Sequence, residues 1–541
     1  MKKTMQMLAL ALVLLLCLPA TGLAMNAEGY PICDEVITIA VAGQNASTPD
    51  WNDTNMVAEV EKRLGIRMEC TSYEADIWST QLTLMIASDD LPDLIVNPDL
   101  SLNDVATYGA QGYFLDMSEY IEEYAPNIQA VMEQYPMYRT YVTSADGGIY
   151  ALCNVSENII ALVPRTWLNK TWMDNLGLKY PTTVEELRDV LLAFKEQDAN
   201  GNGDPDDEIP LSNNGEYTLS PFLTAFGFNT RTTTYLLQAD EEGKVYIGET
   251  TDAYKAYLNY MHSLWEDGLM DVDFFVQDSA TFNAKAAEDK VGMYGAAAPF
   301  VAASKDISYD SGFYWIGALT SEYRDTPTIV QNPAVSRGVK AVVNAQTEYP
   351  AEIVRLLDYY FTEEGKMAGA YGYEGIDWDL EPLGVVGLEE YQVAAQREVE
   401  GYSSAEEYRY TKALINEVFK FITPIANTQY AAMLNANEEQ LEAMLPEYGW
   451  AVQFMRQGMN REGVEMVEPF PALLYTEEED AERAQLYTDI TLYISNMHAQ
   501  FITGQVDIEE GWDAFQEQME AMGLSRLLEI EQAAYDRLMG Q

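Results

Sequence analysis

An alternation of strand-like and helix-like segments near the start of the chain constrains the fold most. The first strand-like run is apolar and β-branched and ends at Gly43, and the first helix-like run stops at Gly65. The strand-like residues are 36–42, 66–70 and 91–96, and the helix-like residues are 56–64 and 78–87. A strand–helix–strand–helix–strand order predicts a parallel sheet with crossover helices. We therefore expect an α/β protein.

The rest of the chain extends this pattern and then becomes helical. A second α/β segment begins near Ile159, and its helix at residues 184–194 follows Thr182 and Thr183, each three residues before a glutamate. That spacing is a capping-box signature. From about Pro350 helical periodicity dominates. The main helix-like segments there are residues 352–362, 405–421, 438–445, 480–501, 508–522 and 525–539.

The first 24 residues predict export. Lys2 and Lys3 precede an apolar run at residues 8–18, and the small residues Gly22 and Ala24 suit signal-peptidase cleavage. The run is shorter than the roughly 20 residues that a membrane span needs. Cys17 follows Leu16, where a lipoprotein signal has a small residue, so lipidation of Cys17 is disfavoured but stays open. We expect a secreted protein at the outer face of the cell membrane or in the cell envelope, with an unsettled lipid anchor.

The charge balance excludes some partners. The chain has 87 acidic and 31 basic residues and a net charge of −56. Such a balance argues against nucleic acid and anionic membrane surfaces as partners. It favours a strongly solvated surface, and we expect a monomer.

The sequence offers little material for catalysis. It has two histidines, His262 and His498, on helix-like segments without a serine or cysteine motif nearby, and it lacks the G-x-S-x-G, H-E-x-x-H and P-loop motifs. Its mature cysteines are widely spaced, which disfavours a zinc site. Acidic residues are too numerous for a glycosidase pair to be singled out. We therefore expect a protein that is not an enzyme.

Residues 198–208 form the sharpest local motif. Oxygen-bearing side chains alternate at its first, third and fifth positions and Gly203 follows at the sixth, as in the first half of an EF-hand calcium loop. The candidate ligands are Asp198, Asn200, Asn202, the backbone carbonyl of Asp204, and Asp207 or Glu208. Position twelve is Ile209, so the last acidic ligand must come one or two places early. The alternative is an ordinary Asn-Gly-rich turn. We expect structural Ca²⁺, because extracellular calcium fills even a site with a Kd of about 10⁻⁴–10⁻³ M.

Motifs spread along the mature chain resemble those of the extracellular solute-binding proteins of family 1, the substrate-binding proteins of ABC transporters. The resemblance is to the lipoprotein branch that includes alginate-binding proteins. The matching segments are residues 91–95, 115–121, 125–128, 167–170, 175–178, 181–194, 289–294, 371–378, 501–504 and 512–536. Their order and coverage, more than any single segment, make the match specific.

The resemblance implies a two-lobed periplasmic-binding-protein-like α/β fold (type II) with a helix-rich C-terminal half. It also implies capture of an oligosaccharide in an interlobe cleft, closure about a hinge, and delivery to ABC permease subunits. The family's calcium site falls on the same loop. We divide the chain into a signal peptide (1–24), an N-terminal tail (25–35), lobe 1 (36–155, with a return segment at about 285–345), lobe 2 (156–284) and a mainly helical remainder (346–541) that completes lobe 2.

Aromatic side chains near strand ends are the candidate sugar contacts, because flat rings pack against the C–H faces of sugars. The candidates are Trp51, Trp78, Tyr294, Trp315 and Trp378, and the alternative for each is a place in the core or on the surface. The acidic balance favours a neutral glycan over a uronate polymer. Two other functions stay open: a secreted, calcium-stabilised glycoside hydrolase, which would release new reducing ends, and a cell-surface adhesion or scaffold protein, which no small ligand would stabilise.

Overall fold

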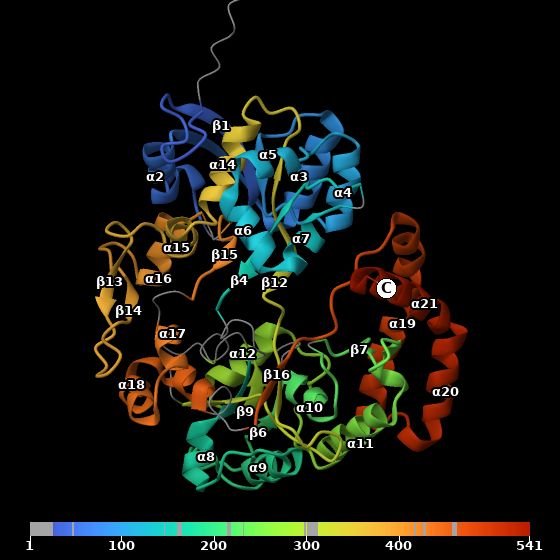
Figure 1. Cartoon of the computed structure of the whole chain (residues 1–541). Coiled ribbons are helices and arrows are strands. Elements are labelled where there is room, and N and C mark those ends of the chain that lie inside the picture. Colours follow the sequence, from blue (N-terminus) through green and yellow to red (C-terminus); the bar gives the residue numbers. More distant parts are fainter. Residues whose placement is uncertain are drawn as a thin grey trace, which may run out of the picture. The chain divides into compact units, whose positions relative to one another are not determined.

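The computed structural model describes residues 25–540 except 46–47, 145, 159–164, 214–217, 231, 297–298, 300–311, 416–417, 426–428 and 457–462. The chain forms two compact units. Unit 1 is Met1–Glu157, Val335–Glu381 and Ala394–Pro424, and unit 2 is Asn158–Ala334, Pro382–Val393 and Ile425–Gln541 (Figure 1). Within the described ranges no helix is both long and apolar enough to cross a membrane. The predicted signal peptide, with Cys17, lies outside them.

Unit 1 is built on a six-stranded sheet with the order β15-β4-β12-β3-β1-β2. Strand β1 (Ile37–Asn45) pairs in parallel with β2 (Ile66–Glu74) and with β3 (Leu94–Val96), as the strand–helix alternation predicted. β12 (Val335–Val343) runs antiparallel to β3 and to β4 (Leu152–Ser156). Most strands therefore share a direction, and their carboxyl ends lie at one edge of the sheet.

The turn between the first helix and β2 shows how local chemistry fixes this arrangement. Helix α2 (Asn55–Leu64) is capped at its start by Thr54, whose side chain accepts a hydrogen bond from the Val57 N–H, and at its end by Gly65. Gly65 has φ +73°, and a Cβ there would lie 2.1 Å from the Cys33 carbonyl oxygen. Only glycine satisfies both the left-handed backbone and the close approach.

The other elements that lie wholly or mostly in unit 1 are helices and two short strand pairings. The helices are η1 (Trp51–Asp53), α3 (Ala75–Ser88), α4 (Leu102–Ala110), α5 (Ser118–Tyr124), α6 (Pro126–Gln134), α7 (Pro136–Val142), α14 (Pro350–Tyr359), α15 (Glu363–Tyr371), α16 (Ala405–Tyr408) and the π-helical turn η5 (Arg409–Ala413). The edge strand β15 is Ile422–Thr423, and β13 (Trp378–Pro382) pairs with β14 (Gln392–Gln396) in a separate two-stranded ribbon.

Unit 2 contains a four-stranded sheet with the order β10-β5-β9-β6. β6 (Ile209–Leu211) and β9 (Val291–Gly295) are parallel, and β5 (Thr166–Asn169) is antiparallel to both β9 and β10 (Phe313–Ile316). Two smaller ribbons pair β7 (Leu237–Ala239) with β8 (Val245–Ile247) and β11 (Thr328–Val330) with β16 (Glu465–Val467).

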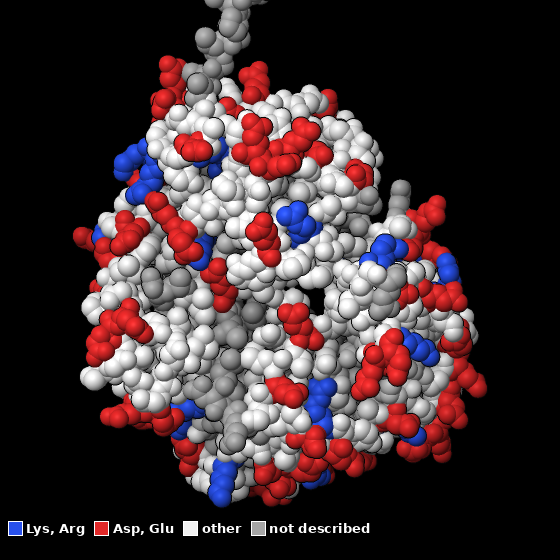
Figure 2. Space-filling view, in the orientation of Figure 1, with Lys and Arg blue, Asp and Glu red and all other residues white. Residues whose placement is uncertain are grey.

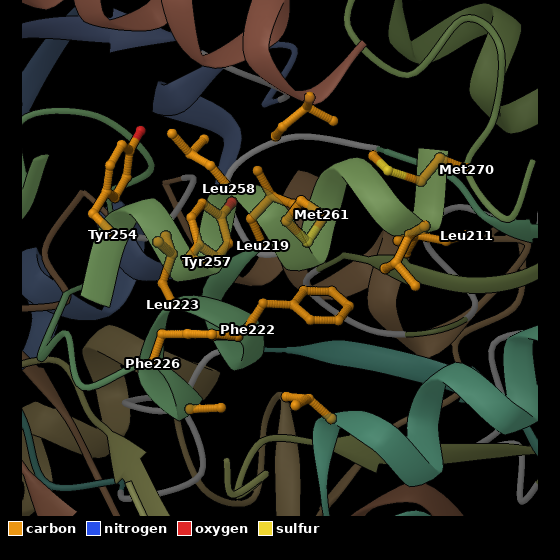
Figure 3. Close-up of a cluster of buried hydrophobic side chains, with 14 of the residues drawn as sticks. Leu211, Leu219, Phe222, Leu223, Phe226, Tyr254, Tyr257, Leu258, Met261 and Met270 are labelled. Atoms are coloured by element: carbon orange, nitrogen blue, oxygen red, sulfur yellow. The ribbon is translucent and has the colours of Figure 1, made fainter. Parts of the chain in front are cut away.

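The core of unit 2 lies between helices. α11 (Asp252–Glu266) buries residues at helical spacing, including Tyr254, Tyr257, Leu258 and Met261. Figure 3 shows these side chains turned toward those of α10 (Ser220–Ala225). The same cluster takes in Ile490 and other buried residues of the three C-terminal helices. Both histidines have structural partners there: the His498 Nε2 lies 3.1 Å from the Tyr257 hydroxyl, and the His262 Nδ1 lies 2.9 Å from the Ile502 carbonyl oxygen.

The other helices of unit 2 include members of a second cluster of buried side chains, in which Phe282, Met433 and Met444 pack with Trp315. These helices are α8 (Lys170–Leu176), α9 (Val184–Glu196), η4 (Gly248–Thr250), α12 (Ser279–Ala287), α17 (Gln429–Leu434), α18 (Glu438–Phe454), α19 (Glu477–Ile502), α20 (Ile508–Ala521) and α21 (Leu524–Met539). The predicted helices at 184–194, 480–501, 508–522 and 525–539 are confirmed within a few residues.

The segments that return to unit 1 are only in part the residues predicted to do so, about 285–345. Residues up to Ala334 belong to unit 2 because β9 and β10 pair with β5, and residues 335–381 and 394–424 belong to unit 1. The predicted boundary between lobe 1 (36–155) and lobe 2 lies within two residues of the observed boundary after Glu157, whereas the predicted remainder 346–541 is divided between the two units. Strand pairing between segments distant in sequence decides membership, and periodicity along the chain does not reveal it.

Candidate functional site

The loop at residues 198–208 connects α9 to β6 within unit 2. The α9 helix ends at Glu196, and Ile209, the first residue of β6, donates its N–H to the Lys290 carbonyl oxygen at 2.8 Å. The Asn175 side-chain amide holds the start of the loop by donating to the Ala199 carbonyl oxygen at 2.9 Å. The loop is therefore fixed at both ends by the secondary structure.

Asp198 has one satisfied and one unsatisfied carboxylate oxygen. Its Oδ2 accepts a hydrogen bond from the Gly203 N–H at 2.9 Å, which closes the loop over five residues. Its Oδ1 is buried and has no hydrogen-bond partner among the residues that the structure describes. Gly203 has φ +92°, a backbone conformation that residues other than glycine rarely adopt.

Asn200 and Asn202 stabilise the turns of the loop through their side chains. The Oδ1 of Asn200 accepts from the Asn202 N–H at 2.9 Å, and the Oδ1 of Asn202 accepts from the Asp204 N–H at 2.7 Å. Their amide groups both donate to the carboxylate of Asp207. Asp204 is exposed, and its Oδ1 accepts from the Asp206 N–H at 3.3 Å.

Glu208 repeats the pattern seen at Asp198. Its Oε1 accepts from the backbone N–H groups of Ala199 at 2.9 Å and Asn200 at 3.3 Å, while its Oε2 is buried and finds no hydrogen-bond partner in the described part of the chain. Burial raises the pKa of the Glu208 carboxyl group above its ordinary value. The sequence left the choice between Asp207 and Glu208 open, and the two carboxylates differ here because amide donors occupy that of Asp207.

These two orphaned oxygens fit a bound cation. A buried carboxylate oxygen without a donor is costly, and a hard cation removes the cost by direct coordination. In the described part of the chain no three His, Cys, Asp or Glu side chains are grouped to hold a metal. A calcium loop of this kind does not require such a group, because asparagine and backbone oxygens complete the shell. The residues present therefore suit Ca²⁺.

A second candidate site lies in unit 1, in the loop that follows β3 at the carboxyl edge of the sheet. Asn97 and Asp99 both have positive φ, +45° and +57°, on either side of Pro98. The Asn97 N–H donates to the Lys340 carbonyl oxygen at 2.8 Å, and the Trp78 Nε1 donates to the Pro98 carbonyl oxygen at 3.0 Å. Unusual backbone held by such contacts is a marker of functional loops, and the carboxyl edge is where α/β sheets bind ligands.

Sequence reasoning missed this loop. The sequence does contain a signal for it, because the turn-forming residues Asn-Pro-Asp directly follow the third predicted strand. Asp99 is exposed, while the side-chain oxygen of Asn97 accepts from the Lys340 Nζ at 3.0 Å. An exposed carboxylate and a fixed amide are groups that read sugar hydroxyls.

The five aromatic residues predicted to contact a sugar are all buried. Their exposed fractions are 1% for Trp51, 0% for Trp78, 1% for Tyr294, 0% for Trp315 and 4% for Trp378. The ring N–H of Trp51 donates to the Asn45 Oδ1 at 3.3 Å, that of Trp378 donates to the Gly372 carbonyl oxygen at 2.8 Å, and Trp315 packs edge-on against Phe454. These contacts give the rings places in the cores of the two units, and their contact with a ligand stays a prediction.

Two α/β units, each with its own sheet, and a carboxyl-edge loop define a two-lobed ligand-binding protein. The chain belongs to the bacterial extracellular solute-binding proteins, whose family profile matches residues 54–367. That match confirms the resemblance found in the sequence.

Individual proteins resemble the chain from end to end. The fructooligosaccharide ABC transporter substrate-binding protein FusA of Streptococcus pneumoniae is 26% identical over 520 residues, which cover 94% of this chain and 91% of FusA. The structure of FusA in complex with kestose has a TM-score of 0.69, 23% identity and coverage of 93% of this chain and 100% of that one.

Two further structures share the fold. A solute-binding protein from Bifidobacterium longum infantis, associated with an ABC transporter that binds HMO, has a TM-score of 0.69, 19% identity and coverage of 93% of this chain and 99% of that one. The alginate-binding protein AlgQ2, solved without calcium ion, has a TM-score of 0.61, 19% identity and coverage of 95% and 99%. These similarities confirm the predicted two-lobed fold.

Proposed function

We propose that this chain captures an oligosaccharide outside the cell and delivers it to the permease of a bacterial ABC importer. The observation that carries the proposal is the match to FusA, a substrate-binding protein for fructooligosaccharides, along 94% of this chain and 91% of its relative. A likeness of that extent keeps both units and the order of their segments. The protein acts as a receptor without catalysis of its own.

The ligand class follows from the same relative and from charge. Acidic side chains outnumber basic ones on the face seen in Figure 2, and the whole chain has a net charge of −56. Such a field disfavours polyanions and leaves neutral sugars unaffected. Kestose, a neutral oligosaccharide, is therefore the first sugar to test. Asn97 and Asp99 are the candidate residues for hydrogen bonds to its hydroxyl groups.

Ca²⁺ acts here as a structural ion. Asp198, Asn200, Asn202, Asp207, Glu208 and the backbone carbonyl of Asp204 would hold it. The ion would supply positive charge to the buried oxygens of Asp198 and Glu208, which have no donor among the described residues. Because the loop connects α9 to β6, the ion ties a helix of unit 2 to its sheet.

Export completes the proposal. Residues 1–24 would be removed as a signal peptide, and the mature chain would begin next to Met25, which already forms a β-bridge with Cys33. The mature receptor would then work at the outer face of the membrane, and the question of a lipid on Cys17 can be answered by mass spectrometry of the protein isolated from its own cells.

A thermal-shift screen tests the function. The mature protein is mixed with kestose, nystose, human-milk oligosaccharides and alginate oligosaccharides. We expect one of these sugars to bind stoichiometrically and to raise the Tm of the protein. Incubation with the same sugars should release no new reducing ends. Release of new reducing ends would show that the protein is a glycoside hydrolase and not a receptor. A Tm that no sugar raises would favour an adhesion or scaffold protein.

A further inference from the structure

The calcium-type loop, residues 198–208, concentrates negative charge. It contains five acidic residues and no basic one; the acidic residues are Asp198, Asp204, Asp206, Asp207 and Glu208. Like charges this close repel one another, and the repulsion opposes the compact loop whenever no cation is bound. A positive group that faces the loop from a neighbouring element lowers this repulsion.

The turn before β9 lies against the loop. The Asn200 side-chain nitrogen donates to the Asp207 Oδ1 at 3.2 Å and to the Asp289 carbonyl oxygen at 3.3 Å. The Ile209 N–H, directly after the loop, donates to the Lys290 carbonyl oxygen at 2.8 Å. One amide nitrogen therefore joins the carboxylate of Asp207 to the peptide group that precedes Lys290.

Lys290 brings a positive charge to this junction. Its Nζ lies 2.8 Å from the Glu288 Oε2, and the two side chains are 34% and 64% exposed. The pKa of the Lys290 ammonium group is raised, first by its hydrogen bond to Glu288 and further by the charges of Asp207 and Asp204. The ammonium group therefore lies within the electrostatic field of the loop, and the carboxylate with which it pairs is itself in contact with water.

Lysines on the two neighbouring helices are engaged elsewhere. Lys195, near the end of α9, donates to the Asp267 carbonyl oxygen. Lys285, on α12, pairs with the buried carboxylate of Asp271 at 2.9 Å. Among the lysines of α9, α12 and the turn before β9, Lys290 is therefore the one placed to compensate the charge of the loop.

We propose that Lys290 is a built-in counter-charge of the calcium-type loop, an inference that rests on the calcium binding proposed above. Without calcium, its ammonium group offsets the repulsion among the loop carboxylates and stabilises the loop. With calcium, the same charge repels the divalent ion and weakens its binding. Lys290 thereby shifts the affinity toward the Kd of about 10⁻⁴–10⁻³ M that is typical of extracellular calcium modules, so that occupancy follows the external calcium concentration.

The test compares two substitutions at this position. Lys290→Met keeps the length of the side chain and removes its charge, whereas Lys290→Arg keeps the charge. Lys179→Met is the matched control, because Lys179 is an exposed lysine beyond the end of α8. Each full mature chain is stripped of metal with EDTA. Calcium binding is then measured by calorimetry at low ionic strength, and Tm is measured with and without calcium.

We expect Lys290→Met to bind calcium about three- to tenfold more tightly than the parent, because a unit charge within about 10 Å of a divalent ion repels it even in a water-like dielectric. Its calcium-free form should melt at a lower temperature than the calcium-free parent. Added salt should reduce both differences, because it screens exposed charges. Lys290→Arg and Lys179→Met should match the parent in both measurements.

The outcomes separate this inference from the calcium site itself. Unchanged or weaker calcium binding by Lys290→Met overturns the counter-charge, while the calcium site stands. A Tm that Lys290→Met lowers equally with and without calcium also overturns it, because Lys290 would then have a structural role alone. If the parent binds no calcium, the calcium site fails and the counter-charge fails with it.

Discussion

The side chain of Glu531 on α21 is fully buried and accepts a hydrogen bond from the Nε of Arg483 on α19 at 2.9 Å. The hydroxyl group of Tyr235 also donates to its Oε1 at 3.3 Å, and that of Tyr475 donates to its Oε2. The guanidinium of Arg483 lies over the rings of Tyr475 and Tyr487. One carboxylate thus joins two C-terminal helices and the segment before β7.

Removal of this carboxylate should destabilise unit 2. Glu531→Ala leaves the Arg483 charge largely buried without its partner, and we expect a loss of about 3 kcal/mol of unfolding free energy. Glu529→Ala is the control, because Glu529 is exposed and pairs at the surface with Arg526. Its loss should be under about 1 kcal/mol. Guanidinium unfolding measures both, and equal losses would contradict the prediction.

Calcium should stabilise the parent through Asp198. We expect EDTA to lower Tm, and Asp198→Ala to weaken calcium binding about tenfold or more in calorimetry, because one of few anionic ligands is lost. Asp206→Ala changes an exposed neighbour outside the proposed ligand set and should bind calcium like the parent. A Tm that chelation leaves unchanged would show that the loop is an ordinary turn.

The loop after β3 should contribute to sugar binding. We expect Asp99→Ala to raise the Kd for the bound oligosaccharide about tenfold or more, because a charged hydrogen-bonding group is lost from the ligand edge. Asp89 has a similar φ, +55° against +57°, but it precedes β3 and lies toward the opposite edge. Asp89→Ala should leave the Kd unchanged in the same calorimetric titration, and parallel effects of the two substitutions would argue against a role of the edge.

Glu249 should make stability depend on pH. Burial raises the pKa of its carboxyl group from 4.5 to about 7. Between these values the folded chain keeps the proton and the unfolded chain releases it, so this contribution is complete below pH 4.5 and is lost as the pH rises to 7. Its size is about 3 kcal/mol.

The measurement is the difference in unfolding free energy between Glu249→Gln and the parent at pH 4.5 and at pH 7. The glutamine variant cannot ionise, so this difference should shift in its favour at the higher pH. The same comparison with Glu241→Gln, on an exposed turn, should show no shift. A difference independent of pH for Glu249→Gln would place its titration outside this window.

Substitutions at two glycines should distinguish the cost of backbone strain from the cost of a steric clash. Gly29 and Gly65 have nearly the same φ, +72° and +73°, but a Cβ at Gly29 meets no described atom within 4 Å. We expect Gly29→Ala to cost about 1 kcal/mol and Gly65→Ala about 3 kcal/mol, because only the second also collides with the Cys33 carbonyl group. Equal changes of Tm would contradict the steric account.

Local signals predicted many elements but not every one. The helix α19 follows its predicted range closely, because Thr476 caps it and its apolar spacing continues to Ile502. The predicted helix at 405–421 is instead interrupted after Ala413. Leu414, Ile415 and Phe421 are fully buried there, and Ile422 pairs with Val155 of β4. Burial and strand pairing outweigh helix propensity in that segment, and neither is visible from its own residues.

The calcium-type loop was likewise predictable from the sequence in part. Its residue types and spacing were legible in the sequence, because Asp198 and Gly203 need only each other to close the turn. The distinction between Asp207 and Glu208 required the folded chain, which brings Ala199 and Asn200 to one oxygen of Glu208 and leaves the other buried and unpaired.

The sequence by itself determined the fold class, the family resemblance and the position of the calcium-type loop, because each depends on residues that are neighbours along the chain. The tertiary structure alone decided which segments share a unit, that the five predicted aromatic residues lie in the cores, and that Asn97 and Asp99 stand at a sheet edge. Burial depends on contacts between distant segments, so a residue's type and neighbours do not fix whether it faces the core, a ligand or water.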